Sequence, residues 1–524
     1  MKQSKLLAIL SVVLLSTNTL WAAAQTNERR FTAIGKGGAI SCGHPLAAAA
    51  AIKILQEGGN AVDAAVCAGF MLGVVDFSNS GIGGDGFALI RLSSGRIVAF
   101  DGSARRPRLQ QKTVSDNDIG LPTMPEMLLK LLRLYGNKSP QEVLIPSVTT
   151  CVNGFKISAY LEKTIEKKLL TLKDSASIDF LAPGGYPLRA GQIIKQPVLA
   201  RTLLQLARDG GRSFYRGNDA MQLLADMQRR GSEYQFEDMA LFSSKPVKPV
   251  KFSYQNYNIY GTPPPSSSVA TIKLAIDLLN SAKKLFPRTG KELVDLARIG
   301  QKVINAKYAG IAACMNNPAA FADLADATPI DQNTSSPTID DTNTTHLCVW
   351  DKTGMIVSMT LTLGNHFGTG EFSPGGFFYN NELRNYKNVV ASYPADYPAS
   401  AGPVSSKSPL LITRKGQPWL AIGGAGSNRI IFNTALTLAR TIAGYELTDS
   451  ITAPRFYLDY RNRMSIEWQK RPDLTSEIRA LLPDTEIKAG CDDFFGLVSA
   501  IQASGSYLIS AGDQRRDGCC ESEP

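Results

Sequence analysis

Two threonines with the potential for acyl-transfer chemistry lie in the segment Asn343 to Gly370. Apolar side chains occupy every second position on both sides of a turn: Leu347, Val349, Val357, Met359, Leu361 and Leu363. This period of two is typical of strands with one buried face. The turn at 351–354 predicts a β-hairpin with a three-residue loop and Gly354 in the left-handed conformation. That register places Thr344 opposite Thr362, because a slip of one residue would mix the apolar and polar faces.

The residues before this hairpin indicate where the chain can be cut. Residues 325–343 are polar, contain two prolines and have no apolar period, so we expect an exposed loop. Cleavage of the Asn343–Thr344 bond would give Thr344 a free α-amine with a pKa near ~8. A nucleophilic hydroxyl and its general base would then belong to one residue, an arrangement known for acyl transfer. The alternative is that a threonine-rich strand reflects β-propensity alone.

Two glycine-rich turns have different predicted roles. Residues 423–428 lie between an expected strand and a helix, where consecutive backbone N–H groups suit an oxyanion; a plain strand-to-helix turn is the alternative. Residues 81–86 match G-x-G-x-x-G but follow a helix and enter a strand, which is the reverse of the dinucleotide-binding order. We therefore expect a tight turn or a close backbone approach there, and no cofactor. Three histidines without zinc-type spacing predict no metal site.

Composition and charge restrict the classes of function. With 44% hydrophobic and 19% charged residues among 524, the chain has globular composition. Its formal charge of +10 is scattered among acidic residues, so we expect no nucleic-acid partner. Residues 1–24 have the charged, apolar and small-residue regions of a secretory signal peptide, with an apolar run shorter than the ~20 residues of a membrane span. The mature protein should be soluble and secreted or periplasmic.

Several motifs resemble the γ-glutamyltranspeptidase family of N-terminal nucleophile hydrolases. The clearest are T-T-H at 344–346, T-x-T-L at 360–363 and F-G-T-G at 367–370. Others follow in the family's order over nearly the whole mature chain, among them G-G-N-A-V-D-A-A-V (58–66), S-G-I-G-G-D-G-F (80–87), P-P-P-S-S-S (263–268), N-N-E-L (380–383) and D-Q-R-R-D-G (513–518). The resemblance implies an α+β fold, a four-layer α/β/β/α sandwich. It also implies self-cleavage into a large subunit (25–343) and a small subunit (344–524) that stay associated.

The resemblance assigns roles to individual residues. Thr344 matches the nucleophile and Thr362 the threonine that orients it, while Gly426 and Ser427 match the glycine pair of the oxyanion hole. Ser405 and Ser406 match a serine pair that contacts the substrate. Glu382 matches the residue that binds the glutamyl α-amino group. Beside the nucleophile, His346 should face Thr360, and we interpret it as a structural hydrogen-bonding residue rather than an acid or base.

Three positions depart from the family pattern. One is Gly364, where the family has an asparagine that comes one place later here, at Asn365. Ser103 stands where the family has the arginine that binds the substrate α-carboxylate, so Arg105 or Arg106 would have to replace it. Asn385 stands where an aspartate pairs with the α-ammonium. The cleavage chemistry therefore looks intact, whereas the clamp for the substrate's charged groups looks weakened.

The predicted function is that of a γ-glutamyltransferase and glutathione hydrolase that works by ping-pong acyl transfer, without a cofactor or metal. Its substrates would be glutathione or another γ-glutamyl or acyl amide, with an amine or water as acceptor. One alternative is a related amidase or acylase for glutaryl-type amides. Another is a catalytically silent family member that acts as a binding protein.

The coarse secondary structure completes the prediction. We expect helices at 45–59, 60–75, 197–208, 218–229, 269–285 and 429–443, and strands at 87–92, 250–260, 377–381, 409–414 and 419–422.

Overall fold

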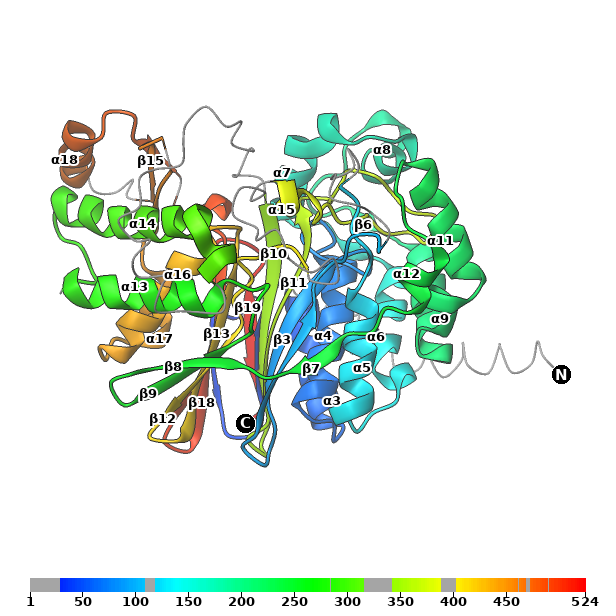
Figure 1. Ribbon diagram of the computed structural model, residues 1–524, viewed down its shortest axis with the longest axis horizontal. Coiled ribbons are helices and arrows are strands. Elements are labelled where there is room, and N and C mark those ends of the chain that lie inside the picture. Colours follow the sequence, from blue (N-terminus) through cyan, green and yellow to red (C-terminus); the bar gives the residue numbers. More distant parts are fainter. Residues whose placement is uncertain are drawn as a thin grey trace.

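The chain forms two β-sheets that face each other, with helices on both outer sides (Figure 1). The computed structural model describes residues 29–108, 118–282, 284–314, 342–387, 402–459, 461–467, 472–488 and 490–524. The predicted signal peptide and residues 325–341 of the predicted loop lie outside these ranges. The arrangement is the predicted α+β fold, an α/β/β/α sandwich in four layers.

Each of the two sheets has seven strands within the described residues. In spatial order the first contains β1 (Thr32–Gly35), β18 (Tyr507–Ala511), β17 (Leu497–Ser504), β13 (Gln417–Ala425), β12 (Leu410–Arg414), β9 (Tyr257–Gly261) and β8 (Val250–Tyr254). The second contains β19 (Cys519–Ser522), β2 (Ala39–Cys42), β10 (Thr342–Trp350), β11 (Ile356–Asn365), β3 (Asp85–Arg91), β4 (Ile97–Gly102) and β7 (Lys245–Val247). Both ends of the predicted small subunit therefore contribute central or edge strands to the second sheet.

The helices divide between the two outer faces (Figure 1). Those beside the second sheet are α3 (Pro45–Gln56), α4 (Ala61–Val75), α5 (Met124–Tyr135), α6 (Pro140–Asn153), α7 (Ala159–Lys168), α8 (Ser175–Leu181), α9 (Pro197–Asp209), α10 (Arg212–Arg216), α11 (Asn218–Arg229) and α12 (Phe236–Ala240). Those beside the first are α13 (Ser268–Ala282), α14 (Gly290–Cys314), α16 (Arg429–Ile442), α17 (Leu447–Thr452) and α18 (Pro472–Leu481). Shorter elements are α15 (Arg384–Lys387), β5 (Phe155–Lys156), β6 (Ile193–Ile194), β14 (Phe456–Leu458), β15 (Met464–Ile466) and β16 (Glu486–Ile487).

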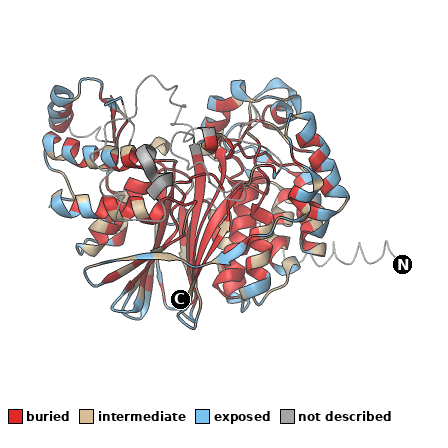
Figure 2. Ribbon diagram, in the orientation of Figure 1, coloured by how far each residue is buried: buried red, intermediate tan, exposed pale blue. Residues whose placement is uncertain are grey.

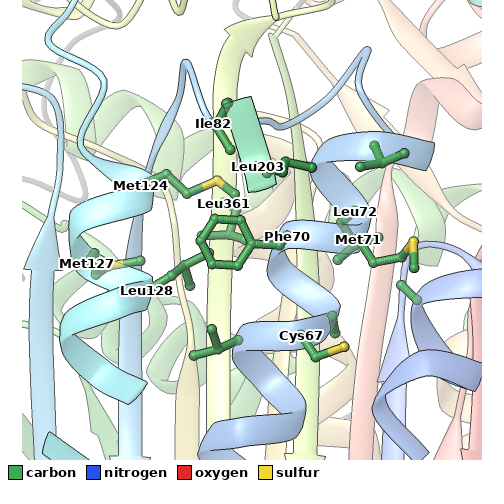
Figure 3. Packing of buried hydrophobic residues seen from close by; sticks show 14 of the residues in the cluster. Cys67, Phe70, Met71, Leu72, Ile82, Met124, Met127, Leu128, Leu203 and Leu361 are labelled. Carbon is green, nitrogen blue, oxygen red and sulfur yellow. The ribbon is translucent and has the colours of Figure 1, made fainter. Parts of the chain in front are cut away.

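Buried side chains form one large apolar cluster on the outer face of each sheet and a smaller one between the sheets. The strands of both sheets are mostly buried, whereas the outer parts of the helices are exposed (Figure 2). In the cluster next to the second sheet, Phe70 of α4 lies among side chains of α5 and β11, including Met127 and Leu361 (Figure 3). Every residue of α4 is buried. Burial of a large apolar side chain contributes about 1.5–3 kcal/mol, so α4 holds the sheet firmly from behind.

The hairpin turn is tied to that helix by hydrogen bonds. One carboxylate oxygen of Asp351 accepts from the backbone N–H of Ala61, at 2.8 Å, and so helps to cap α4. The other accepts from the backbone N–H groups of Thr353 and Met355, at 2.8 and 3.1 Å. Such caps typically contribute about 1 kcal/mol, and this one fixes β10 and β11 relative to the helix layer.

The structure confirms most predicted elements and corrects four expectations. Residues 250–260 form the hairpin of β8 and β9 and not one strand, and residues 377–381 make only an isolated bridge at Phe378. The hairpin of β10 and β11 is buried on both faces, because its polar face packs against the opposite sheet and not against water. Asn343, expected in an exposed loop, is 3% exposed and belongs to β10. In the described part of the chain, no helix has the length and apolar character needed to cross a membrane.

Candidate active site

The strands β10 and β11 bring the two predicted threonines together. The turn has the predicted form, with Gly354 at φ +79° and its N–H donating to the Asp351 carbonyl at 3.0 Å. The register pairs Thr345 with Leu361 but Asn343 with Gly364, so β11 carries one extra residue as a β-bulge. The bulge was not predicted. It lies where Thr344 and Thr362 face each other.

The hydroxyl groups of these threonines surround the bond expected to break. The Thr362 hydroxyl donates to the Asn343 carbonyl oxygen at 2.5 Å and accepts from the Gly364 N–H at 2.8 Å. The Thr344 hydroxyl lies 3.5 Å from the Thr362 oxygen. Thr344 and Thr362 are 4% and 2% exposed. The Thr344 hydroxyl therefore lies beside a carbonyl that is already polarised by a hydrogen bond, and both threonines are buried.

Arg516 fixes the residues on both sides of the same peptide bond. Its guanidinium donates to the Thr344 carbonyl oxygen at 3.0 Å and to the side-chain oxygen of Asn343. The group is buried and lies 5.7 Å from the centroid of the Tyr160 ring. One contact holds the Thr344 backbone and the other holds the Asn343 side chain, so Arg516 fixes both residues of the bond expected to break.

The predicted oxyanion turn adjoins this arginine. Gly426 and Ser427 follow β13, with φ values of +122° and +61°, and α16 begins two residues later. A Cβ atom on Gly426 would lie 2.9 Å from the Gly496 Cα and 3.9 Å from a guanidinium nitrogen of Arg516. Ser427 holds a left-handed conformation that is costly for a residue with a side chain, a kind of strain common at active sites. The turn thus lies on the Arg516 side of the scissile bond.

The predicted serine pair lies on the segment that precedes β12. The Ser405 hydroxyl accepts from the Lys407 N–H at 3.2 Å. The Ser406 hydroxyl accepts from the Lys307 ammonium at 2.5 Å and donates to the Asn428 side-chain oxygen at 3.3 Å. Burial lowers the pKa of Lys307 to about 8, and the Glu382 carboxylate opposes that change.

A cluster of buried charges adjoins the serines. The Lys407 ammonium contacts Asp85 Oδ1 at 2.5 Å and Glu382 Oε2 at 3.2 Å. Asn385 donates to the same Glu382 oxygen at 3.1 Å. Burial alone would lower the pKa of Lys407, but the Asp85 and Glu382 carboxylates outweigh it and the pKa is raised. Burial raises the pKa of Asp85, against the effect of the Lys407 ammonium.

The two arginines considered for substrate carboxylate binding have different surroundings. Arg105 forms an ion pair with Asp101 at 2.9 Å, and its guanidinium also donates to the Ser103 hydroxyl at 2.5 Å. Arg106 lies 5.4 Å from the centroid of the Tyr386 ring, one residue beyond Asn385. Arg105 is therefore engaged within its own loop, whereas Arg106 lies against the helix that carries Asn385.

Comparisons with known proteins agree with this geometry. The family described as gamma-glutamyltranspeptidase matches residues 47–522. The chain belongs to the γ-glutamyltranspeptidase family. It is 28% identical over 454 residues to the glutathione hydrolase proenzyme of Escherichia coli strain K12, covering 78% of each chain. It is also 28% identical over 498 residues to the capsule biosynthesis protein CapD proenzyme of Bacillus anthracis, covering 92% of this chain and 90% of that protein.

A solved structure extends the likeness of fold. The cephalosporin acylase from Bacillus halodurans superposes with a TM-score of 0.77 at 22% identity, covering 95% of this chain and 98% of that one. Members of the γ-glutamyltranspeptidase family are enzymes of the N-terminal nucleophile type. The predicted family, fold and enzyme class are therefore confirmed.

The structure also shows the surroundings of His346. Its Nδ1 lies 2.8 Å from the Thr360 hydroxyl, the predicted partner. Burial lowers the pKa of His346 to about 3, so the ring is neutral near pH 7. A neutral ring whose two nitrogens face Thr360 and Cys348 fits the structural role that we predicted.

Several of the residues described above had no predicted role, among them Asp85, Lys307, Lys407 and Arg516. Arg516 belongs to the D-Q-R-R-D-G motif that contributed to the family resemblance, but nothing in the sequence connects it with Thr344. Lys407 follows the serine pair directly, and the signal that could have found it is a lone lysine in an otherwise apolar and small-residue stretch, S-S-K-S-P-L-L-I. Arg516 is 172 residues from Thr344 in sequence, and Lys407 is 322 residues from Asp85. Contacts over such separations cannot be recognised from the sequence.

Proposed function

We propose that this chain is a proenzyme that cleaves itself between Asn343 and Thr344, and that the new N-terminal threonine transfers the acyl group of a γ-linked amide to water or an amine. One observation carries the proposal: the Thr362 hydroxyl donates to the Asn343 carbonyl while the Thr344 hydroxyl lies beside it. The name proenzyme, carried by relatives with 28% identity, supports the same maturation.

Maturation follows from this arrangement in two steps. The Thr344 oxygen attacks the Asn343 carbonyl carbon, and the hydrogen bond from Thr362 stabilises the charge that develops on the carbonyl oxygen. The C–N bond breaks as the proton lost by the Thr344 hydroxyl passes to the Thr344 nitrogen, which leaves an ester between Asn343 and the Thr344 oxygen. Water hydrolyses the ester to an Asn343 carboxylate and a free Thr344 amine. The products are subunits of residues 25–343 and 344–524, after removal of residues 1–24.

Turnover uses the same atoms with an external amide. The free amine of Thr344 takes the hydroxyl proton as the oxygen attacks the substrate carbonyl, and it returns a proton to the leaving amine. The backbone N–H groups of Gly426 and Ser427 stabilise the oxyanion. Water or a second amine then releases the acyl group from Thr344, a ping-pong sequence.

The serine pair and the charge cluster form the acyl pocket, which we define as Asp85, Glu382, Asn385, Ser405, Ser406 and Lys407. Hydrogen bonds and ion pairs already described link all of its members except Ser406, which lies between Ser405 and Lys407 in the chain. Asp85 pairs in register with Thr362. The pocket therefore begins one strand away from the nucleophile. Arg105 and Arg106 lie on the loop after β4 as candidates for binding a substrate carboxylate. Export to the periplasm or outside the cell is part of the proposal and rests on residues 1–24.

N-terminal sequencing of the purified protein tests the maturation. Two fragments should appear on a denaturing gel. They should stay together under native conditions, because β10 lies between β2 and β11 within one sheet. The smaller fragment should begin at Thr344, and the processed protein should release nitroaniline from γ-linked acyl anilides. A first residue other than Thr344, or full activity in an uncut chain, would contradict the mechanism. A protein that is cut but hydrolyses no acyl amide would support the binding-protein alternative.

A further inference from the structure

Lys407 places a permanent positive charge inside the acyl pocket. Its side chain is 3% exposed, and its ammonium contacts Asp85 at 2.5 Å and Glu382 at 3.2 Å. The ammonium also lies 5.5 Å from the centroid of the Phe87 ring, whose π-face favours a cation. A lysine ammonium buried this deeply persists only when paired, and here two carboxylates compensate it.

The position of this charge relates it to the reacting bond. Asp85 is the first residue of β3 and pairs in register with Thr362 of β11. Directly opposed residues of an antiparallel pair have Cα atoms about 4.5–5.5 Å apart. Lys407 also follows the serine pair, with its backbone N–H on the Ser405 hydroxyl at 3.2 Å. The ammonium is thus held between the serine segment and the strand beside the catalytic threonines.

The contacts of Lys407 engage the residue expected to recognise a glutamyl α-ammonium. Glu382 Oε2 already receives the Lys407 ammonium and the Asn385 amide. Asp85 is engaged as well, since its second oxygen accepts from the Ala104 N–H at 2.8 Å. A substrate ammonium on Glu382 would lie about 4–5 Å from Lys407. At an effective dielectric constant of 20, this repulsion weakens binding by roughly several hundred-fold.

We propose that Lys407 takes the place of a substrate ammonium, so that the acyl pocket selects donors without an α-amine, namely monoamides of dicarboxylic acids of the glutaryl type. This rests on the proposed acyl transfer by Thr344 and adds the class of donor. The distal carboxylate of such a donor is accommodated by the Lys307 ammonium, which contacts the Ser406 hydroxyl at 2.5 Å. Lys407 is a specificity-determining residue here, because it excludes one donor and leaves the chemistry at Thr344 unchanged.

The test compares glutaryl-p-nitroanilide with γ-glutamyl-p-nitroanilide on the self-processed protein. The ratio of the two kcat/KM values is independent of the amount of active enzyme. The wild-type protein should prefer glutaryl by at least about tenfold, and Lys407→Met should shift the ratio toward γ-glutamyl by roughly several hundred-fold. Lys407→Arg keeps the charge and should keep the glutaryl preference.

A second variant controls for the unpaired carboxylate that remains when Lys407 is replaced. Lys407→Met leaves Asp85 without its cation, so the double variant Lys407→Met with Asp85→Asn removes both charges and should show the same shift in ratio. Self-cleavage at Thr344 reports that each variant is folded. A γ-glutamyl preference in the wild type, or an unchanged ratio in the folded variants, would overturn the inference while leaving the acyl-transfer function in place. Failure of the processed wild type to hydrolyse either anilide would instead overturn the proposed function, and the donor assignment with it.

Discussion

The Asn343–Thr344 bond, where we propose cleavage, and the proposed acyl pocket lie one strand apart, yet they are built from different groups. Around the Asn343–Thr344 bond the contacts are neutral hydroxyl and backbone groups, with the Arg516 guanidinium as the one charge among the contacts described. In the proposed acyl pocket, the Lys407 ammonium lies 2.5 Å from the Asp85 carboxylate and 3.2 Å from the Glu382 carboxylate. Neutral hydrogen bonds can serve many substrates, whereas buried charges discriminate strongly between donors. We therefore expect that substitutions in the acyl pocket can change donor specificity without changing the reaction at Thr344.

The largest effect should come from the nucleophile itself. Thr344→Ala removes the oxygen that attacks the Asn343 carbonyl, so the chain should stay in one piece and show no anilide hydrolysis. Denaturing electrophoresis and a kinetic assay measure both outcomes. Thr345→Ala is the matched control, because the Thr345 hydroxyl lies on the opposite face of β10, where a Cβ on Gly43 would approach it to 2.6 Å. The Thr345→Ala control should be cut and active. If Thr344→Ala were cut, Thr344 would not be the attacking residue.

The next effect concerns the hydroxyl that polarises the scissile carbonyl. Thr362→Val keeps the shape but removes the 2.5 Å hydrogen bond to Asn343. Loss of one such donor typically slows a reaction about 10²–10³-fold, and we expect that decrease in the rate of self-cleavage. Thr362→Ser retains the hydroxyl and should be cut much faster than the valine variant. Equal rates for the two variants would show that this hydrogen bond does not drive cleavage.

The hairpin and its threonine pair were predictable because they depend on local sequence. Alternation of apolar residues sets the register, and Gly354 sets the turn, so the facing positions of Thr344 and Thr362 follow. The β-bulge did not follow, because it depends on how Asn365 meets residues distant in sequence, such as Asn381, whose side chain accepts its N–H at 2.8 Å. The close backbone approach expected at the glycines after α4 is confirmed: a Cβ on Gly84 would lie 2.2 Å from the Thr362 carbonyl oxygen.

The charges of the acyl pocket were not predictable in the same way. Asp85, Glu382 and Lys407 come from three segments that only the tertiary fold brings together. The family resemblance identified Glu382, but it could not show that a lysine of this chain is already bound to it. The expected strand at 377–381 failed for a related reason. Its apolar residues Phe377 and Phe378 pack among other aromatic rings in a loop, and alternation alone cannot tell such packing from a strand.

A smaller effect should appear in the pH dependence of stability. Burial lowers the pKa of His346 to about 3, whereas the unfolded chain has an ordinary value near ~6.5. Between these values the unfolded state binds more protons, so stability falls as pH decreases below ~6.5, by about 2 kcal/mol at pH 5 for one such histidine. His346→Asn should remove this part of the slope in urea unfolding curves at pH 7 and 5.

The control for that measurement is the other histidine with the same shift. Burial also lowers the pKa of His44 to about 3, and its ring caps α3 by accepting from the Leu46 N–H at 3.2 Å. Asparagine is a good N-cap, so His44→Asn should remove a similar part of the slope. Neither variant should change the pH profile of kcat. A changed profile in His346→Asn alone would assign acid–base work to His346 and remove the contrast between a neutral reaction centre and a charged pocket.

The smallest effect should come from adding a charge to the acyl pocket. Asn385 donates to Glu382 Oε2 at 3.1 Å and carries no charge of its own. Asn385→Asp adds a carboxylate beside Glu382, which gives a substrate ammonium a partner that it does not share with Lys407. Hydrogen bonds to charged groups contribute about 1.5–3 kcal/mol, and repulsion between the two carboxylates offsets part of this. We therefore expect kcat/KM for γ-glutamyl-p-nitroanilide to rise roughly tenfold, with no rise for the glutaryl substrate. Asn385→Ala removes the amide without adding charge and should produce no such gain. An equal change on both substrates would mean that position 385 acts through the shape of the pocket, and the charge-based account of specificity would then rest on Lys407 alone.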